Sequence, residues 1–351
     1  MTELLQIDDL AIRFRSYGHD INVLNGVSYS VGWKESVGLV GESGSGKSVT
    51  NLAVMGLLPT AVIDRGRMRF DGQDILAMGP ARRRRLRGRQ IGMIFQDPMN
   101  SLNPVLKIGR QIEEGIILHF RVSRSEARRR AADILARCEL SDTDVLLNKY
   151  PHELSGGMLQ RVMIAAALVL EPKLLIADEP TTALDVTVQA QMLDLMSSRV
   201  REAGASMVLI SHDLGVVASV TDRVNVMYAG SIVESGPSIE VFLRPMHPYT
   251  VGLVHSIPSL SEDRGVVPID GSPPDLAALP PGCPFAPRCR WRLPVCDRIK
   301  PAMEPIHRSG AAGSRAIACH NPVSDREAAS GTPEPRAVSA GVTQADRMAG
   351  L

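Results

Sequence analysis

The feature that most constrains this chain is a glycine-rich loop, Gly41-Glu-Ser-Gly-Ser-Gly-Lys-Ser48, which fits the pattern G-x-x-x-x-G-K-[ST]. A short apolar run, 36–40, precedes the loop, and a helical pattern that Pro59 ends follows it. A strand, a glycine-rich turn and a helix N-terminus together direct backbone N–H groups toward an anion. We therefore expect an α/β domain that binds a nucleotide.

The residues of this loop are expected to share the work of holding a triphosphate. Lys47 would reach the β- and γ-phosphates as a point charge, and the Ser48 hydroxyl would coordinate Mg²⁺. The other expected ATP contacts are Gly41, Glu42, Ser43, Gly44, Ser45, Gly46 and Val49. The alternative is a turn that matches by chance, as in roughly one random chain in a hundred of this length. The flanking strand and helix favour nucleotide binding.

An acidic pair, Asp178-Glu179, ends the apolar run 174–177. In parallel α/β sheets, ligands bind at the carboxyl ends of the strands. Asp178 is expected to hold Mg²⁺ through water, and Glu179 to orient or polarise the attacking water. Alone, such a pair more often caps a helix. The phosphate-binding loop upstream favours the catalytic interpretation.

Two further polar residues follow apolar runs. Gln96 comes after 91–95, and His212 comes after 207–210. A polar side chain just past a strand end can sense the γ-phosphate, and Gln96 is also a candidate Mg²⁺ ligand. Alone, each would more often be an ordinary loop residue.

The string Leu154-Ser-Gly-Gly-Met-Leu-Gln160 precedes another helix and resembles the signature of ATP-binding cassette (ABC) ATPases. A hydroxyl and bare N–H groups at a helix N-terminus again suit an anion. In that family the loop closes over the γ-phosphate bound to a second subunit. The resemblance implies this role for Ser155, Gly156, Gly157 and Gln160.

The motifs also occur in the order of that family, over about residues 4–235. The resemblance implies that Asp185, in Ala183-Leu-Asp185, links the two sites across a dimer. It also implies that Phe14 stacks on adenine, with Tyr17 as the nearby alternative. A core aromatic is the other interpretation of Phe14.

The expected fold is therefore α/β: a P-loop ABC ATPase cassette at 1–235. It comprises a RecA-like parallel sheet core, an N-terminal antiparallel β subdomain and an inserted helical subdomain at about 98–170. Prolines become frequent after residue 235, which predicts a loop-rich extension at 236–321. The segment 322–351 is rich in Ala, Ser, Gly, Pro and charge, and we expect it to be disordered.

Longer strings narrow the resemblance. Ile94-Phe-Gln-Asp-Pro-Met-Asn-Ser-Leu-Asn-Pro104, the stretch 177–191 and His247-Pro-Tyr-Thr250 look like the ATPases of oligopeptide/dipeptide importers, and so does the extension. Leu159 departs from the basic residue usual there, which affects only local contacts. The resemblance implies two transmembrane permeases, a homologous or identical second ATPase and an extracytoplasmic solute-binding protein. Dipeptides, longer peptides, metal chelates and glutathione-like molecules all remain possible cargo.

The chain has no apolar run of the ~18 residues that a membrane helix needs, and we read no signal peptide. With the importer resemblance, this implies a peripheral subunit on the cytoplasmic face of a bacterial inner membrane.

Four of the five cysteines cluster in the extension: Cys283, Cys289, Cys296 and Cys319. Four converging thiolates can hold a [4Fe–4S] cluster or a zinc ion. The C-x₂₋₄-C knuckle usual in structural zinc sites is absent, and the importer resemblance also favours iron–sulfur. Reduced structural thiols are the remaining alternative. Cys138 reads as a buried apolar residue on a helix.

An arginine run at 82–89 is the sharpest charge patch, and it could bind nucleic acid or anionic lipid. Lys plus Arg number 39 and Asp plus Glu number 38, for a net charge of +1. This balance, without interleaved aromatics, argues against nucleic acid and favours a solvated helix face. A soluble ABC ATPase acting on ribosomes or DNA stays the alternative, but the chain has neither a second cassette nor a long coiled-coil insertion. A catalytically silent subunit is opposed by intact Lys47, Glu179, Ser155 and His212.

Overall fold

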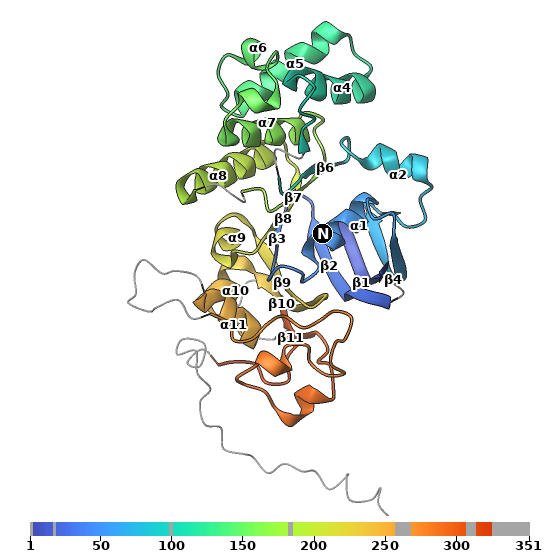
Figure 1. The fold of residues 1–351 in the computed structure, drawn as a ribbon, viewed down its shortest axis with the longest axis vertical. Helices are drawn as coiled ribbons and strands as arrows, with labels where there is room; N and C mark the ends of the chain where they lie inside the picture. The colour runs from blue at the N-terminus through green and yellow to red at the C-terminus, as the bar shows by residue number, and fades with distance from the viewer. Residues whose placement is uncertain are drawn as a thin grey trace, which may run out of the picture.

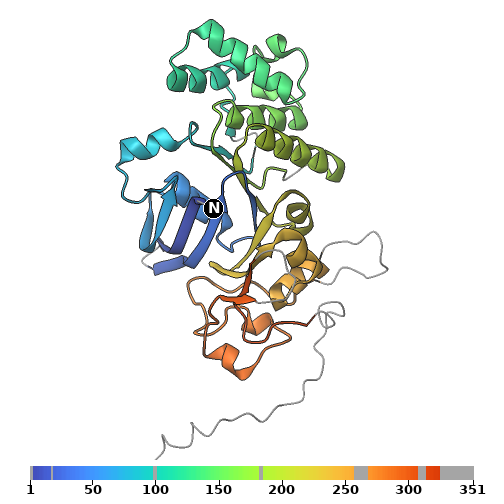
Figure 2. The same ribbon diagram turned by 180° about the vertical axis from the view of Figure 1, so that it is seen from behind.

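The computed structural model describes residues 3–16, 19–97, 101–181, 185–256, 268–306 and 314–324. A layer of helices lies at one end of the molecule, two sheets lie in the middle, and the extension lies at the other end (Figure 1). Figure 2 shows the same order from behind. Among the helices that these ranges contain, none is both long and apolar enough to cross a membrane.

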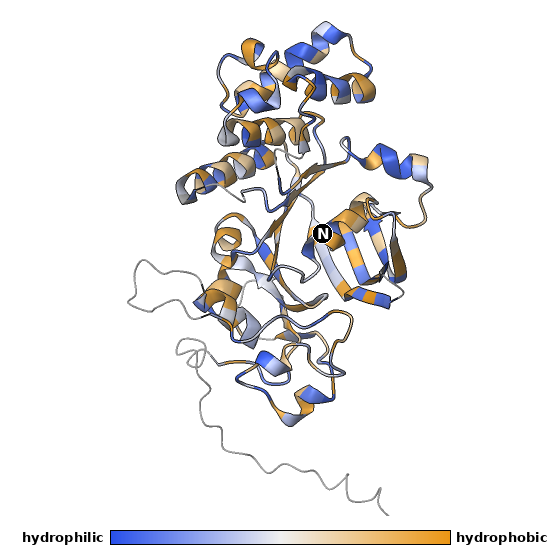
Figure 3. Ribbon diagram, viewed as in Figure 1, coloured by the Kyte–Doolittle hydropathy of each residue, from blue (hydrophilic) through white to orange (hydrophobic). Residues whose placement is uncertain are grey.

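The N-terminal part forms an antiparallel sheet in the order β2-β1-β4-β5. Its strands are β1 (Glu3–Ser16), β2 (His19–Gly32), β4 (Ala61–Phe70) and β5 (Gln73–Asp74). Apolar side chains of these strands, among them Leu10 and Ile12, are buried, and Figure 3 shows hydrophobic and hydrophilic bands along the strands. The buried face shares one core with Val54 of the helix that follows the glycine-rich loop.

The central sheet has the order β11-β12-β10-β9-β3-β8-β7-β6. Its strands are β3 (Ser36–Val40), β6 (Ile91–Ile94), β7 (Leu174–Asp178), β8 (Ser206–Ser211), β9 (Arg223–Tyr228), β10 (Ser231–Pro237), β11 (Glu304–Ile306) and β12 (Arg315–Ile317). Strands β9, β3, β8, β7 and β6 are parallel neighbours, and β10, β12 and β11 add antiparallel pairs. In this register Val40 pairs with Ser211, and Asp178 pairs with Ile210. The carboxyl ends of the parallel strands therefore share one edge.

The helices cover this sheet and form the layer at its end (Figure 1). They are α1 (Lys47–Met55), α2 (Pro80–Leu86), α4 (Ile108–Phe120), α5 (Arg124–Arg137), α6 (Thr143–Leu146), α7 (Gly156–Leu168), α8 (Val186–Glu202), α9 (Leu214–Val220), α10 (Ser238–Leu243) and α11 (Pro248–His255). Short 3₁₀ helices are η1 (Pro151–Glu153), η2 (Ala286–Arg288) and η3 (Pro294–Asp297). Ile108, Ile112 and Ile116 recur every fourth residue, and they bury one face of α4 in the same core as α5 and α7.

The arginine run has a partly structural role. Helix α2 buries none of its residues, as expected for a solvated face. However, Arg87 just beyond it donates to the carbonyls of Met55, the last residue of α1, and of Gly56, its C-cap, at 2.9 and 3.1 Å. Arg89 donates to the carbonyl of Leu170 at 2.8 Å. These guanidinium groups hold α1 and the end of α7 in place.

The extension is joined to the central sheet. The predicted boundary at 235 lies inside β10, which pairs with β12 of the extension. A buried ion pair supports this junction, because Arg315 Nη2 donates to Glu234 Oε1 at 2.6 Å. Val323 is buried in a small core with Val251 and Trp291, so the packed structure continues past 321. Residues 325–351, where we expect disorder, lie outside the described residues.

Candidate functional site

The glycine-rich loop joins β3 to α1 and surrounds the Lys47 ammonium. Lys47 Nζ donates to the carbonyl oxygens of Gly41 and Glu42 at 2.6 and 2.9 Å. Lys47 is buried, and this burial lowers the pKa of its ammonium, opposed by the nearby Glu179, Asp178 and Glu42 carboxylates. The loop backbone thus holds a desolvated positive charge beside the first turn of α1.

Two glycines of the loop are required by the backbone. Gly46 precedes α1 with φ 102° and no side-chain cap, which leaves the first N–H groups of the helix available to an anion. A Cβ on Gly41 would lie 2.1 Å from the Met227 carbonyl oxygen. Ser43 and Gly44 are exposed, Ser45 is buried, and Val49 is half-buried on α1.

The predicted magnesium ligands come together only in part. Ser48 Oγ donates to Asp178 Oδ1 at 3.0 Å, across 130 residues of sequence. Burial raises the pKa of the Asp178 carboxyl, and the Ser48 hydrogen bond and Lys47 partly oppose this rise. Gln96, the third predicted ligand, contacts Glu179 instead.

Glu179 is the centre of the predicted catalytic set. Gln96 Nε2 donates to Glu179 Oε2 at 3.0 Å, and His212 Nδ1 lies 3.6 Å from the same oxygen. Glu179 follows β7 with φ 46°, an uncommon conformation for this residue type, and its N–H donates to the Ile210 carbonyl. The ends of β6, β7 and β8 therefore bring Gln96, Glu179 and His212 to one point.

The signature lies at the start of α7. Ser155 is exposed and caps the helix, because its hydroxyl accepts from the Met158 N–H at 3.3 Å. Gly156 is also exposed, but Gln160 is buried, only 2% exposed. We expected Gln160 to face a second subunit with the signature, and its burial inside this chain removes it from that surface.

Other predicted residues have different surroundings. Asp185 is exposed and caps α8 by accepting from the Val188 N–H at 3.0 Å. Phe14, on β1, is half-buried against the core shared with α1. Tyr17, its alternative, and Ala183 lie outside the described residues.

Sequence reasoning missed two residues of the extension that contact the loop. The Tyr249 hydroxyl accepts from the Glu42 N–H at 2.6 Å, and the Arg288 guanidinium pairs with the Glu42 carboxylate at 2.7 Å. Tyr249 lies in the quoted string 247–250, and Arg288 precedes Cys289. The sequence around Tyr249 or Arg288 does not indicate that either residue contacts Glu42, more than 200 positions away.

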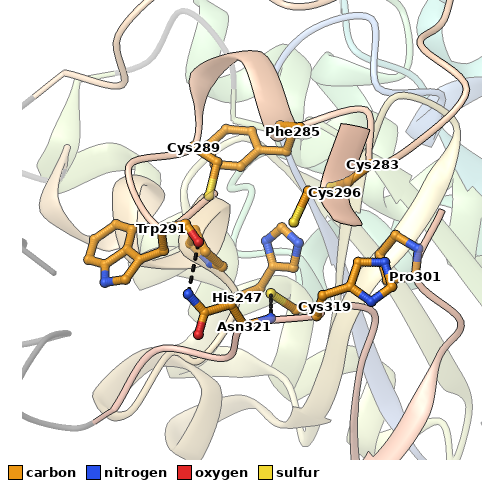
Figure 4. Close-up of a pocket in the computed structure, with 12 residues that line it drawn as sticks. His247, Cys283, Phe285, Cys289, Trp291, Cys296, Pro301, Cys319 and Asn321 are labelled. Carbon is orange, nitrogen blue, oxygen red and sulfur yellow. Dashed lines mark hydrogen bonds between the residues drawn. The ribbon is translucent and has the colours of Figure 1, made fainter. Parts of the chain in front are cut away.

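The four extension cysteines line one cavity with His247, Phe285 and Trp291. Figure 4 shows Cys289, Cys296 and Cys319 pointing into it. No disulfide joins any of these cysteines. Nevertheless, in the described part of the chain no three His, Cys, Asp or Glu side chains form a group that could hold a metal ion. The predicted four-ligand set is therefore present as a shared cavity and not as a formed metal site.

Comparison with known proteins agrees with this geometry. The ABC transporter family matches residues 24–182, and the family "Oligopeptide/dipeptide transporter, C-terminal region" matches residues 233–296. The dipeptide transport ATP-binding protein DppD of Bacillus subtilis is 47% identical, over 86% of this chain and 91% of its own length. The oligopeptide transport ATP-binding protein OppD of Salmonella typhimurium is 45% identical, over 92% of this chain and 95% of its own.

Solved structures give the same assignment. A dimeric ATP-binding cassette in a post-hydrolysis state, bound to ADP and Pi, aligns with TM-score 0.58 and 28% identity over 65% of this chain and 96% of its own. A part of the ABC transporter complex cbiONQ from Clostridium perfringens aligns with TM-score 0.60 and 29% identity, over 69% and 91%. The predicted cassette fold is confirmed. The chain belongs to the ABC transporter family, in its group of ATP-binding proteins of oligopeptide and dipeptide transport.

Proposed function

We propose that this chain hydrolyses ATP at the shared carboxyl edge of β3, β8, β7 and β6 and thereby drives a peptide-type importer. The observation that carries the proposal is the convergence of Gln96, Glu179 and His212 beside the Ser48–Asp178 pair. The Lys47 ammonium and the N-terminus of α1 supply positive charge for the phosphates.

Each side chain then has a role set by its chemistry. Glu179 accepts a hydrogen bond from the attacking water and orients it, while Gln96 and His212 sense the γ-phosphate from two sides. Ser48 and Asp178, with Gln96 once it leaves Glu179, would hold Mg²⁺, which supplies charge stabilisation to the phosphates when bound. Positioning and charge stabilisation account for most of the rate enhancement in this chemistry.

The signature glycines support a site shared between two chains. Gly156 and Gly157 have no positive φ, and a Cβ on either would meet nothing within 4 Å. Glycine at the start of a helix is therefore not required by this fold and costs up to about 1 kcal/mol relative to alanine. Glycine would be required here if a nucleotide bound to a second copy or homologue brought its phosphates close to the bare backbone at Ser155 to Gly157. Asp185 would then contact the opposite site.

The relatives' names support import of peptides or related solutes. We propose that the chain works with two transmembrane permeases, a second ATPase subunit and an extracytoplasmic solute-binding protein, peripheral to the cytoplasmic face of a bacterial inner membrane. Co-purification from a detergent extract tests this assembly. We expect permease subunits in the eluate, whereas ribosomal proteins in their place would favour the soluble ATPase alternative.

We also propose that the cysteine cavity holds a [4Fe–4S] cluster. Two of the four sulfurs accept a backbone N–H: the Cys296 sulfur accepts from Leu293 at 3.5 Å, and the Cys319 sulfur accepts from Asn321 at 3.4 Å. Such donors stabilise thiolate ligands.

The cysteine spacing favours a cluster over a single zinc ion, because the C-x₂₋₄-C knuckle that is usual in structural zinc sites is absent. The cluster would fasten a loop-rich extension. We expect brown protein with about four irons and four sulfides per chain under anaerobic handling. Colourless protein with one zinc would overturn this assignment.

Glu179→Gln tests the catalytic proposal. The amide keeps the size of the side chain and its contact with Gln96, but it is a much poorer acceptor for the proton of water. We expect unchanged Mg-ATP affinity and turnover below about one hundredth of the original rate. Unchanged ATPase activity in this variant would remove Glu179 from its role.

A further inference from the structure

One glutamate of the phosphate-binding loop is held by the extension. The Arg288 guanidinium binds both carboxylate oxygens of Glu42, with Nη1 to Oε2 at 2.7 Å and Nη2 to Oε1 at 3.0 Å. The two residues lie 246 positions apart. The Arg288 side chain is 5% exposed and that of Glu42 is 26% exposed, so this bidentate pair is largely desolvated.

The remaining polar groups of Glu42 are also occupied. Its N–H donates to the Tyr249 hydroxyl at 2.6 Å, and its carbonyl accepts from Lys47 Nζ at 2.9 Å. Glu42 therefore contacts two residues of the extension, Arg288 and Tyr249, and also the Lys47 ammonium of the ATP site. Movement of the Glu42 backbone would displace one of the two carbonyls that hold Lys47.

The partners of Glu42 are themselves held firmly. Arg288 Nε donates to the Asp270 carbonyl at 2.8 Å, and the guanidinium lies 5.9 and 5.8 Å from the ring centroids of Tyr228 and Phe285. The Tyr249 ring packs against the same two rings, at 4.6 and 5.5 Å. A planar fork fixed on aromatic faces loses little further freedom when it binds a carboxylate.

We propose that Arg288 is a positioning residue for ATP binding: through Glu42 it fixes the backbone of the phosphate-binding loop and hence the Lys47 ammonium. The extension is then part of the support of the ATP site. This inference rests on the proposed function, since it assumes that ATP binds at this loop.

Calorimetric titration of the full-length chain with Mg-ATP, well below its melting temperature, tests the proposal. For Arg288→Ala we expect the Kd to rise at least about fivefold with unchanged stoichiometry. Arg288→Lys keeps the charge but loses the second hydrogen bond, and we expect an intermediate Kd. In the complete transporter, KM should rise more than kcat falls, because the chemistry of Glu179 is untouched.

Arg292→Ala is the matched control. Arg292 lies in the same segment of the extension and loses the same charge, but it pairs with Asp297, with side chains 48% and 42% exposed. We expect its Kd to equal that of the wild type. An equal rise in both variants would show a long-range charge effect and overturn the proposal, as would an unchanged Kd in Arg288→Ala.

Two further results separate positioning from folding. Arg288→Ala could lower the stoichiometry because part of the sample is unfolded. In that case the full-length Glu42→Gln variant, alone and combined with Arg288→Lys, supplies the test. We expect the rise in Kd of the double variant to be smaller than the sum of the two single effects on the binding free energy. Additive effects would refute the coupling. A wild-type chain that binds no Mg-ATP would instead refute the proposed function.

Discussion

The signature glycines allow an experiment that separates the fold of this chain from its activity. We consider Gly157→Ala. A Cβ at this position would have no heavy atom within 4 Å, and Gly157 has no positive φ. The substitution therefore adds a methyl group that nothing within the described chain opposes.

The expected change in stability follows from helix propensity alone. Alanine in place of glycine stabilises a helix by up to about 1 kcal/mol, and less in its first turn. In a chain of this size that corresponds to a rise in Tm of at most about 3 °C. A donor of the kind that the signature backbone would offer is worth about 10²–10³ in kcat, so we expect ATPase activity of the assembled transporter to fall at least about tenfold.

Calorimetric melting and ATPase assays on the same preparation supply both numbers. Gly41→Ala is the contrasting variant, because its Cβ would lie 2.1 Å from the Met227 carbonyl oxygen and should lower both Tm and ATP binding. If Gly157→Ala lowered Tm as much as Gly41→Ala does, this glycine would be required by the fold. If it retained full ATPase activity, a site completed by a second subunit would be refuted.

Two predictions concern residues away from the ATP site. Arg315→Met leaves the buried Glu234 carboxylate without its cation, so we expect the free energy of unfolding to fall by about 3–5 kcal/mol in urea titrations. Arg290→Met breaks an exposed pair and should lower the same free energy by no more than about 1 kcal/mol. Burial raises the pKa of the Cys138 thiol to about 11, so we expect its peptide to stay unlabelled by iodoacetamide at pH 8 until the chain is unfolded. Labelling of the native protein at the rate of a free thiol would contradict this burial.

Local signals in the sequence were sufficient to predict strands of the parallel sheet and the polar residues that follow them. The apolar runs 36–40, 174–177 and 207–210 correspond to β3, β7 and β8. Because parallel strands end at one edge, polar residues just after such runs lie along that edge. The strand order β8-β7-β6, which the sequence does not indicate, then brings Gln96 and His212 to Glu179.

Contacts between distant or short segments had no such signal. Strand β12 has three residues, too few for a period, and it is held by β10 and the Glu234–Arg315 pair. The burial of Gln160 depends on how α7 packs, which a glycine-rich motif at its start does not indicate. The contact of Arg87 with the end of α1 likewise depends on tertiary structure. In the sequence, nothing distinguishes Arg87 from the other arginines of its run.

The position of Arg288 connects the two chemical features of the chain. Arg288 ends the 3₁₀ helix η2 and contacts Glu42 of the phosphate-binding loop, and the next residue, Cys289, lines the cysteine cavity. Adjacent residues cannot move independently by more than the backbone between them allows. Whatever orders the cavity therefore also orders the guanidinium that holds Glu42, and a loop rich in proline and poor in regular structure needs such ordering. This is a physical reason for an ATP-binding cassette to carry an extension of this kind: the extension stabilises from outside the loop that holds Lys47.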